Sequence, residues 1–399
     1  MVTYTADTPE GPVTYVDRKR WLWAGALVYP LFPLLGIVPH ALTGDETWFF
    51  VPLVLSYALL PLLDYLIGED TSNPPEAVVP LLEADPYYRW LTMATVPMHF
   101  FTLIFCAWYA ATQPLTTAGF VGVAIMAGLA SGIGINTGHE LGHKKPLLER
   151  VLARIVLAVP AYGHFAVEHN RGHHRWVATP EDPASSRMGE SIYRFALREM
   201  PGGVIRAWQS ERERLERKGL SVFSRHNEIL QSYAITAVLQ LTLIAVLGWS
   251  MVPFLLLHNF LAWWQLTSAN YIEHYGLKRT RRDSGRYERC QPWHSWNSNH
   301  VCSNLLLFHL ERHSDHHAHP TRRYQSLRDF PDLPSLPNGY YGMFVLAYIP
   351  PLFFRVMDRR LLALKHVDGD LSRVNMDPAS EARLRARYGA TDDRQALTA

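Results

Sequence analysis

Six long apolar runs are the feature of this sequence that most constrains its fold. A helix needs about 20 apolar residues to cross a bilayer, and each run reaches that length. Tryptophans lie near the ends of several runs, as is typical of a membrane interface. One such run could be a buried core helix, but six of them predict a multi-pass membrane protein. The runs cover residues 21–41, 48–67, 90–111, 115–135, 229–249 and 251–270, and the tryptophans are Trp21, Trp48, Trp90, Trp108 and Trp249.

Lysine and arginine are distributed unevenly between the runs. They are absent from three short turns and abundant in the N-terminal flank and in two long segments, so the positive-inside rule predicts that both termini and both long segments are cytoplasmic. The polar first 20 residues indicate no cleavable signal peptide. The turns without basic residues are 42–47, 112–116 and 249–251, and the basic segments are 18–20, 144–228 and 278–399.

The expected architecture is an all-α membrane protein with six transmembrane helices and a histidine-rich helical cap on the cytoplasmic side. Its cysteines form no CxxC pair, so no thiolate metal module is expected. The stretch EARLRARY near the C-terminus predicts a helix followed by a disordered end. The predicted divisions are an N-terminal segment 1–20, a membrane domain 21–357 with cap segments 136–228 and 271–340, and a charged tail 358–399.

Histidines concentrate just past the fourth and sixth runs, in NTGHELGHKK, EHNRGHH, NYIEHYG and RHSDHHAHP. Helical residues three or four apart share a face, so His139 with His143 and His169 with His173 can point the same way, as can His313 with His316 or His317. Adjacent histidines diverge by about 100°, which suits two ions better than one. The spacing therefore predicts a dinuclear metal site with about nine candidate ligands, namely His139, His143, His169, His173, His174, His274, His313, His316 and His317.

Metal binding explains these groups better than packing does. Neutral imidazole binds divalent transition metals, whereas each buried imidazole without a metal would need another polar partner. A structural zinc site needs four ligands and usually includes thiolates, which the groups lack. A separate zinc site at Cys290, His294, His300 and Cys302 is an alternative, but its spacing matches no common zinc finger.

Two other functions remain open on these motifs. The stretch HELGH at 139–143 matches the HExxH motif of zinc proteases, but it leaves seven clustered histidines unexplained. A metal transporter would carry ionisable residues in mid-membrane, where these runs are largely apolar.

Longer strings around the histidines resemble one enzyme family. The segments HELGHK, EHNRGHHRWVATPEDPASS, NYIEHYGL, HSWNSN and LERHSDHHAHPTRRYQSLR are similar to those of the integral-membrane, non-haem di-iron alkane 1-monooxygenases. The resemblance covers about residues 17–357. The histidine groups alone would also fit membrane fatty-acid desaturases and hydroxylases, and the strings NYIEHYGL and RHSDHHAHPTRRYQ favour the alkane branch.

The resemblance implies terminal hydroxylation of medium-chain n-alkanes with O2 and two electrons from rubredoxin, itself reduced by an NADH-dependent rubredoxin reductase. It implies two non-haem irons held by the nine histidines, in a bacterial inner membrane, with lipid around the spans and no nucleic-acid partner. Zinc has no redox chemistry, whereas iron can activate oxygen. Nearby carboxylates should balance the charge and orient the rings, with Glu273 favoured among Glu140, Glu168, Asp182, Glu273, Glu311 and Asp315.

Three further features carry weaker expectations. Leu53, Tyr57 and Leu60 in the second run are candidate walls of a substrate channel that opens to the bilayer. Two series of glycines spaced by four, Gly128 with Gly132 and Gly134 with Gly138 and Gly142, predict close helix packing. The basic stretch LKRTRRDSGRYER at 277–289 is a candidate docking surface for an acidic rubredoxin, through Lys278, Arg279, Arg281 and Arg282.

Overall fold

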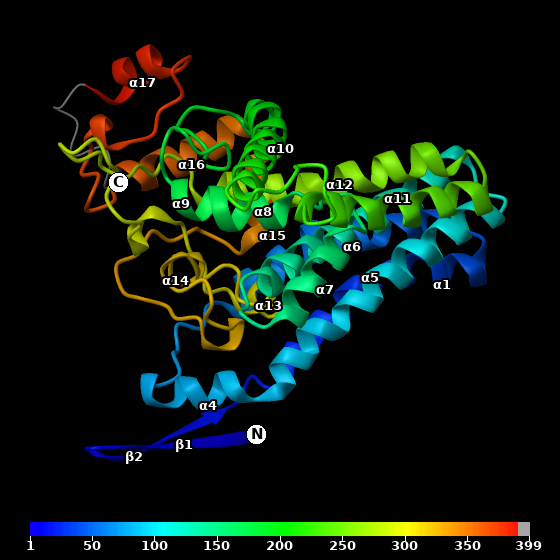
Figure 1. The fold of residues 1–399 in the computed structure, drawn as a ribbon, viewed down its shortest axis with the longest axis horizontal. Helices are drawn as coiled ribbons and strands as arrows, with labels where there is room; N and C mark the ends of the chain where they lie inside the picture. Colours follow the sequence, from blue (N-terminus) through cyan, green and yellow to red (C-terminus); the bar gives the residue numbers. More distant parts are fainter. Residues whose placement is uncertain (390–399) are drawn as a thin grey trace.

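The structure is a computed structural model that describes residues 1–389. Helices α1, α5, α6, α11 and α12 form an elongated bundle, and α10 lies with shorter helices and long loops toward the left-hand side of the view (Figure 1). The bounds are α1 (Leu34–Thr43), α2 (Val51–Val54), α3 (Leu60–Ile67), α4 (Val79–Ala84), α5 (Pro86–Thr112), α6 (Thr117–Gly142), α7 (Leu147–Leu157), α8 (Phe165–Glu168), α9 (His174–Trp176), α10 (Ile192–Glu216), α11 (Glu228–Leu247), α12 (Met251–Glu273), α13 (Val301–Leu306), α14 (His313–Ala318), α15 (Tyr340–Ala347), α16 (Pro350–Leu362) and α17 (Glu381–Tyr388).

Short turns of other helix types connect or interrupt these helices. Two π-helices lie at Leu55–Leu59 and His169–His173, and π-helical turns are frequent at functional sites. The 3-10 turns are Leu22–Leu27, Tyr29–Leu31, Glu46–Phe50, Glu76–Val78, Pro292–His294, Tyr324–Ser326 and Leu371–Arg373.

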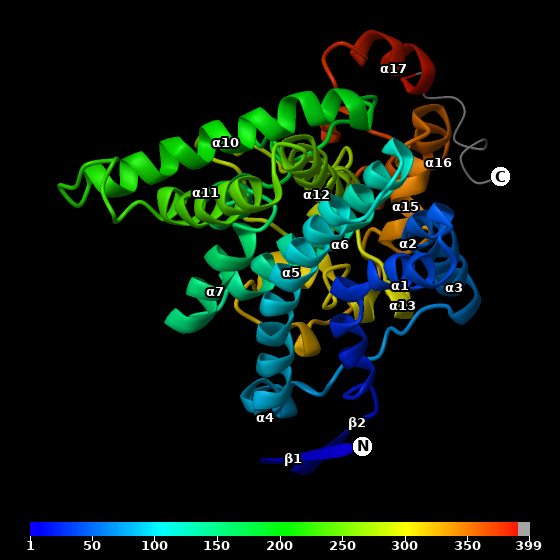
Figure 2. The same cartoon turned by 90° about the vertical axis from the view of Figure 1, so that its right-hand side faces the viewer.

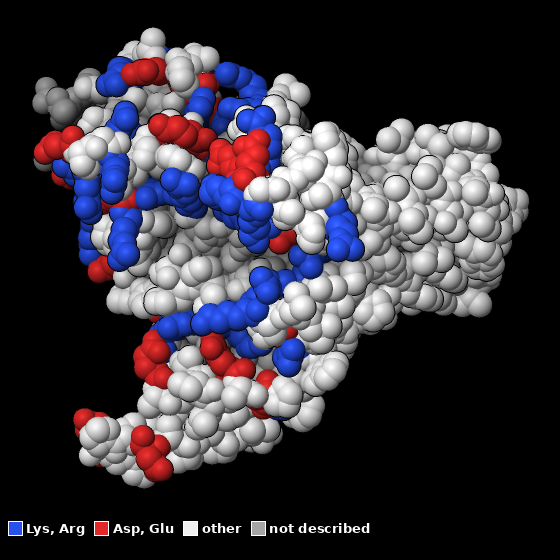
Figure 3. Space-filling model, viewed as in Figure 1, with Lys and Arg blue, Asp and Glu red and all other residues white. Residues whose placement is uncertain are grey.

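Four helical segments are long and apolar enough to cross a membrane. They are Glu46–Ile67, α5, α6 and α11, and a fifth is obtained if Leu22–Leu31 and Leu34–Thr43, which are bent by 53°, count as one span. Figure 3 shows the same division on the surface, because the bundle end is free of charged side chains on this face while lysine, arginine and carboxylates cover the other end. The chain is therefore a multi-pass membrane protein.

The sixth predicted run lies in α12, which is a continuous helix of 23 residues. It is not among the apolar spanning helices, because its sequence includes polar residues such as His258, Asn259 and Gln265, all of them buried. These residues face protein rather than lipid. His258, for example, is hydrogen-bonded through Nε2 to the Ser131 hydroxyl of α6 at 2.7 Å.

Small residues of α6 allow the close helix packing expected from their spacing. A Cβ atom at Gly128 would lie 2.8 Å from the His258 carbonyl oxygen of α12, and one at Gly132 would lie 2.6 Å from Gln265. Gly142 differs, because a Cβ there would meet nothing closer than 3.6 Å. The packing prediction is thus confirmed for the glycines that face α12.

The expectation of an all-α chain is wrong at the N-terminus. Residues Val2–Thr8 (β1) and Gly11–Asp17 (β2) form an antiparallel hairpin, which projects beyond α4 at one edge of the molecule (Figures 1 and 2). The segment is rich in Thr, Val and Tyr, which favour strands, and Gly11 at the turn has a φ of 115°. Tyr4 and Tyr15 pack against the cluster around Trp23, which fixes the hairpin to the helices.

The C-terminal segment packs against the histidine-bearing end. The predicted helix EARLRARY is confirmed as α17, whereas the disordered end predicted after it falls on 390–399, outside the described residues. Val374 and Leu384 are buried, and the backbone N–H of Asn375 donates to the Gly276 carbonyl at 2.8 Å. This contact holds the tail against the loop that follows His274.

Candidate metal centre

The π-helix at His169–His173 sets the direction of three histidines. A π-helix has i→i+5 hydrogen bonds and is wider than an α-helix, and across this turn the Nε2 atoms of His169 and His174 lie 3.1 Å apart. The expectation that His169 and His173 point the same way is confirmed, because their rings stack with centroids 5.2 Å apart. Their ring nitrogens nevertheless belong to different groups of possible metal ligands.

The other histidines follow ordinary helical spacing. His139 and His143 lie at the C-terminal end of α6, and His313 and His317 lie four residues apart on α14, with Nε2 atoms separated by 3.0 Å. His274 ends α12, and its Nε2 lies 3.2 Å from that of His313. The C-terminal ends of α6 and α12 and helix α14, which are far apart in the sequence, thus bring their histidines together at one site.

All nine predicted histidines converge, and they do so as two adjoining sets. Within each set the ring nitrogens lie within 4.8 Å of one another. The members of each adjacent pair, His173 with His174 and His316 with His317, belong to different sets, as the expected divergence of neighbouring side chains requires. Set A is His139, His143, His169, His174 and His316, and set B is His173, His274, His313 and His317.

The chemistry of both sets fits a transition-metal ion. The Nε2 atoms of His143 and His173 are buried and have no hydrogen-bond partner among the described residues, which is costly unless another ligand takes the lone pair. Burial lowers the pKa of His316 and His317 well below the usual histidine range. These rings are neutral at pH 7, which is the form that binds metals.

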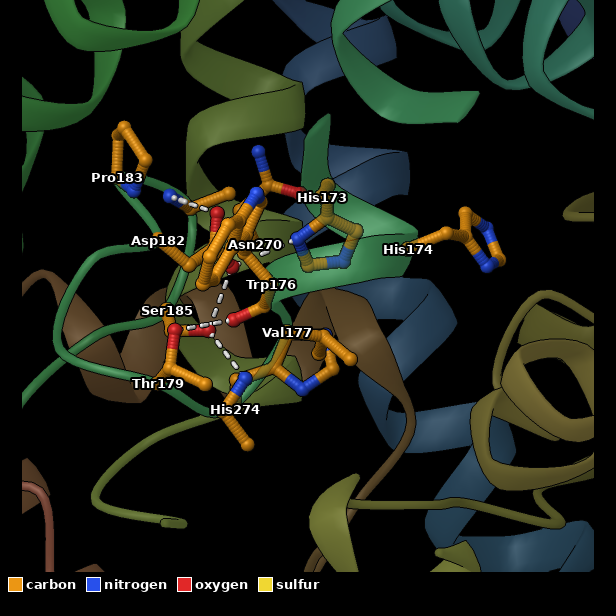
Figure 4. Close-up of polar contacts among 12 residues, drawn as sticks. His173, His174, Trp176, Val177, Thr179, Asp182, Pro183, Ser185, Asn270 and His274 are labelled. Carbon is orange, nitrogen blue, oxygen red and sulfur yellow. Dashed lines mark hydrogen bonds and ion pairs between the residues drawn. The ribbon is translucent and has the colours of Figure 1, made fainter. Parts of the chain in front are cut away.

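Asp182 fixes the orientation of one ring from outside the sets. Its carboxylate accepts from His173 Nδ1 at 2.9 Å and from the Ser185 hydroxyl at 2.7 Å, while the ring of His174 points away from this network (Figure 4). Although burial opposes ionisation, His173 and Arg206 hold the pKa of Asp182 well below its usual range. A carboxylate in this position selects the tautomer that leaves His173 Nε2 free for a metal.

Among the other five predicted carboxylates, Glu273 is the one that touches a ring of the sets. Its Oε2 lies 3.4 Å from His313 Nε2. The remaining four are held by other groups: Glu140 by Lys144 at 2.9 Å, Glu168 by Arg206, Glu311 by the Tyr340 backbone N–H at 2.8 Å, and Asp315 by His319 at 2.8 Å and Arg322 at 3.0 Å.

His294, which the sequence placed only in the alternative zinc site, contacts one of the predicted ligands. The backbone carbonyl of His294 accepts a hydrogen bond from His274 Nδ1 at 3.0 Å, which orients this ring of set B as Asp182 orients His173. The alternative zinc site is not assembled, because Cys290, His294, His300 and Cys302 form no metal-binding group in residues 1–389.

The protease alternative also lacks its geometry. In the HExxH motif the glutamate must face the metal-bound water, but Glu140 pairs with Lys144 and lies outside both sets. Lys144 in turn donates to the Arg322 carbonyl at 2.6 Å, so this pair ties α6 to the loop after α14.

An apolar cavity adjoins the histidines. His139, His169 and His313 line part of it, and the rest of its wall comes mainly from apolar residues of α6, α8, α12, α15 and the α13–α14 loop. The lining includes Ile133, Phe165, Leu266, Ala269, Leu307, Leu310, Tyr341 and Phe344.

The predicted channel residues Leu53, Tyr57 and Leu60 do not line this cavity. Tyr341 of α15 does line it, and its ring centroid is 5.9 Å from that of Tyr57. The Tyr57 hydroxyl nevertheless accepts a hydrogen bond from Gln265, which does line the cavity.

The predicted docking residues differ in exposure. Arg281 and Arg282 are exposed, but Arg279 is buried and its guanidinium donates to the backbone carbonyls of Glu288 and Arg175, each at 2.8 Å. Lys278 is half-buried and donates to the Ser372 carbonyl at 2.9 Å. Arg279 therefore shapes this loop and is not free to meet a partner.

Comparisons with known proteins agree with this site. Residues 115–346 match the fatty acid desaturase family model. Alkane 1-monooxygenase 1 of Alcanivorax borkumensis is 54% identical over 94% of this chain and 92% of its own length. The alkane 1-monooxygenases of Ectopseudomonas oleovorans and Pseudomonas putida are 53% and 52% identical, over 94% and 96% of both chains. The chain therefore belongs to the alkane 1-monooxygenase family, within the wider fatty acid desaturase family.

Proposed function

We propose that the protein hydroxylates the terminal methyl group of medium-chain n-alkanes to give 1-alkanols, using O2 and two electrons. One observation carries the proposal: nine imidazoles form two metal-binding sets beside an apolar cavity. A terminal C–H bond has no polar handle for acid–base chemistry, so a redox metal beside an apolar cavity suits this reaction.

The two sets would hold two non-haem irons, one in set A and one in set B. Iron in these positions would supply the activation of oxygen. Because the ligands are neutral imidazoles, nearby Glu273 and Asp182 supply negative charge. Asp182 and the His294 carbonyl would hold the rings of His173 and His274 in place.

The cavity would position the alkane by shape alone. Three of its polar wall residues are engaged with protein: Asn136 donates to the Leu307 carbonyl at 2.8 Å, Asn270 donates to Glu199 at 3.0 Å, and Gln265 donates to Tyr57. The wall also includes Glu273 and Tyr340, whose hydroxyl has no hydrogen-bond partner among the described residues. The surface left for a ligand is therefore mainly apolar, and it would exclude water from the reacting methyl group. Tyr57, with Leu53 and Leu60 behind it, would support the outer wall of this channel.

The protein would lie in the bacterial inner membrane with six spans, counting α12 and the bent N-terminal pair. The positive-inside rule would place the histidine-bearing end and both termini in the cytoplasm. There it would receive electrons from rubredoxin, which an NADH-dependent reductase keeps reduced. The exposed Arg281 and Arg282, with Lys278 beside them, would attract this acidic donor, and Arg279 would hold their loop.

Purified protein loaded with iron, given rubredoxin, its reductase, NADH and octane, should release 1-octanol. Product analysis and iron content would be measured on the same sample. Formation of an alkene from an acyl substrate, with no 1-octanol from octane, would instead favour a desaturase. One zinc per chain and peptide cleavage would favour the protease.

A further inference from the structure

An exposed tryptophan lies directly beside a buried contact of set B. The side chain of Trp293 is 38% exposed, whereas His294, the next residue, is 1% exposed. Their ring centroids are 5.8 Å apart. One peptide unit therefore connects the protein surface to its interior at this point.

His294 connects this surface position to a histidine of the metal centre. Its carbonyl oxygen accepts from His274 Nδ1 at 3.0 Å, so Trp293, His294 and His274 are joined by covalent bonds and one hydrogen bond. The His294 ring is held as well, because its Nδ1 accepts from the Gln291 backbone N–H at 3.0 Å. Electrons tunnel better along bonded paths than through gaps, and this path is short and rigid.

The loop next to this path is strongly basic. Arg281, Arg282, Arg286 and Arg289 are exposed, and none of them has a carboxylate within ion-pair distance in residues 1–389. Glu288 ties the loop to His294, since its Oε1 accepts from the Thr280 backbone N–H at 2.7 Å and lies 3.5 Å from His294 Nε2. Unpaired arginines beside an exposed aromatic ring form a surface suited to an acidic protein.

We propose that residues 280–294 form the docking surface for an acidic one-electron carrier and that electrons enter the metal centre through Trp293, His294 and His274. This inference rests on the proposed function. In each transfer the carrier loses one electron and the metal centre gains one, with no bond made or broken. Two transfers supply the two electrons used per alkane.

A second aromatic residue offers a rival path. Trp176 follows His174 of set A by two residues and is half-buried, with the Arg175 guanidinium 5.3 Å from its ring centroid. It is therefore the matched control for Trp293. Arg150 on α7, which is exposed and has no carboxylate partner in the described chain, is the matched control for the loop arginines.

The test uses the iron-loaded protein in lipid nanodiscs and a purified acidic rubredoxin. Affinity is measured with zinc-substituted rubredoxin, which binds but transfers no electron. Transfer is measured as the oxidation rate of reduced rubredoxin at saturating concentration in one turnover. We expect Trp293→Leu to slow transfer about tenfold, which is about 1.4 kcal/mol of activation free energy, with iron content unchanged. Trp293→Phe should retain most of the rate.

Charge reversal separates docking from transfer. We expect Arg281→Glu with Arg286→Glu to raise the Kd for zinc-rubredoxin about tenfold at low salt and to have little effect at high salt. The proposal is overturned if Trp293→Leu transfers at the wild-type rate, if Trp176→Leu causes the loss instead, or if Arg150→Glu weakens binding as much. If Trp293→Leu loses iron, the proposal is judged instead by the electron-transfer rate of Trp293→Phe and by the effect of the charge reversals on the Kd for zinc-rubredoxin. Failure of the wild type to oxidise octane would contradict the proposed function, while the affinity measurements would still judge the docking surface.

Discussion

His169 and His174 are five residues apart, and their Nε2 atoms lie 3.1 Å from each other because a π-helix connects them. The wider turn places these two rings in set A and leaves His173, between them, for set B. The ring of His173 still stacks on that of His169 with centroids 5.2 Å apart, as helical spacing predicts, but it belongs to the other set. Which rings can share an ion therefore depends on the positions of the ring nitrogens and not on helical spacing alone.

Replacing His316 with alanine should abolish turnover and reduce iron to about one per chain, because set A loses one of its five rings and metal affinity depends on ligand number. Elemental analysis and the octane assay would measure both effects. His226→Ala, at an exposed position outside both sets, is the control and should keep iron and activity. Full activity of His316→Ala would exclude this ring as a ligand.

Asp182→Asn should weaken metal binding at set B and leave set A occupied. The carboxylate orients His173 through Nδ1, and loss of such an outer partner typically costs about 10–100-fold in affinity. Chelator titration followed by iron-specific spectroscopy would resolve the two ions. Ser185→Ala, which removes the hydroxyl's hydrogen bonds with Asp182 and with the Ala178 backbone N–H but keeps the carboxylate, should have a smaller effect on metal binding. Equal loss from both sets would contradict this assignment.

Ala269→Leu should shift the chain-length preference toward shorter alkanes without changing iron content. Ala269 lines the cavity, so added carbons would occupy space that the substrate needs. Overpacking of this kind costs about 1–3 kcal/mol, which would appear mainly in kcat/KM for the longest alkanes accepted. A panel of alkanes would measure the shift, with Val238→Leu on the exposed side of α11 as the control. An unchanged profile would place the alkane elsewhere.

Gly128→Ala should destabilise the bundle, whereas Gly142→Ala should be tolerated. A Cβ at Gly128 would lie 2.8 Å from the His258 carbonyl of α12, but one at Gly142 would make only ordinary contacts. We expect about 1–3 kcal/mol for the first change, seen as a lower Tm in detergent. Equal Tm values for the two variants would show that α6 and α12 can move apart at little cost.

Asp358 should make stability fall as pH rises. Burial, opposed by hydrogen bonds from Tyr275 and Tyr388, raises the pKa of Asp358 from 3.8 to about 6 in the folded chain. Between these pH values the folded state holds a proton that the unfolded state has lost, so the free energy of unfolding decreases as pH rises. This loss of stability is complete above about pH 6. It amounts to at most about 3 kcal/mol.

Asp358→Asn removes this ionisation and keeps an acceptor for the Tyr275 hydroxyl. Its Tm should exceed that of the wild type at pH 8, and the difference should shrink at pH 4. Tm would be followed across this range in one detergent. A Tm difference independent of pH would mean that Asp358 ionises normally.

The sequence by itself determined that the chain spans a membrane and that nine particular histidines cluster, because hydropathy and short-range spacing are local properties. His139 with His143, and His313 with His317, share a set as helical spacing predicts. The β-hairpin was missed because the long apolar runs outweighed a short strand pattern. Only the tertiary structure decided how rings from α6, α12 and α14 divide between two sets, and that Tyr57 does not line the cavity. It also decided that Arg279 is buried. These outcomes depend on packing between segments far apart in the chain, and on a local π-helix that no residue spacing specifies.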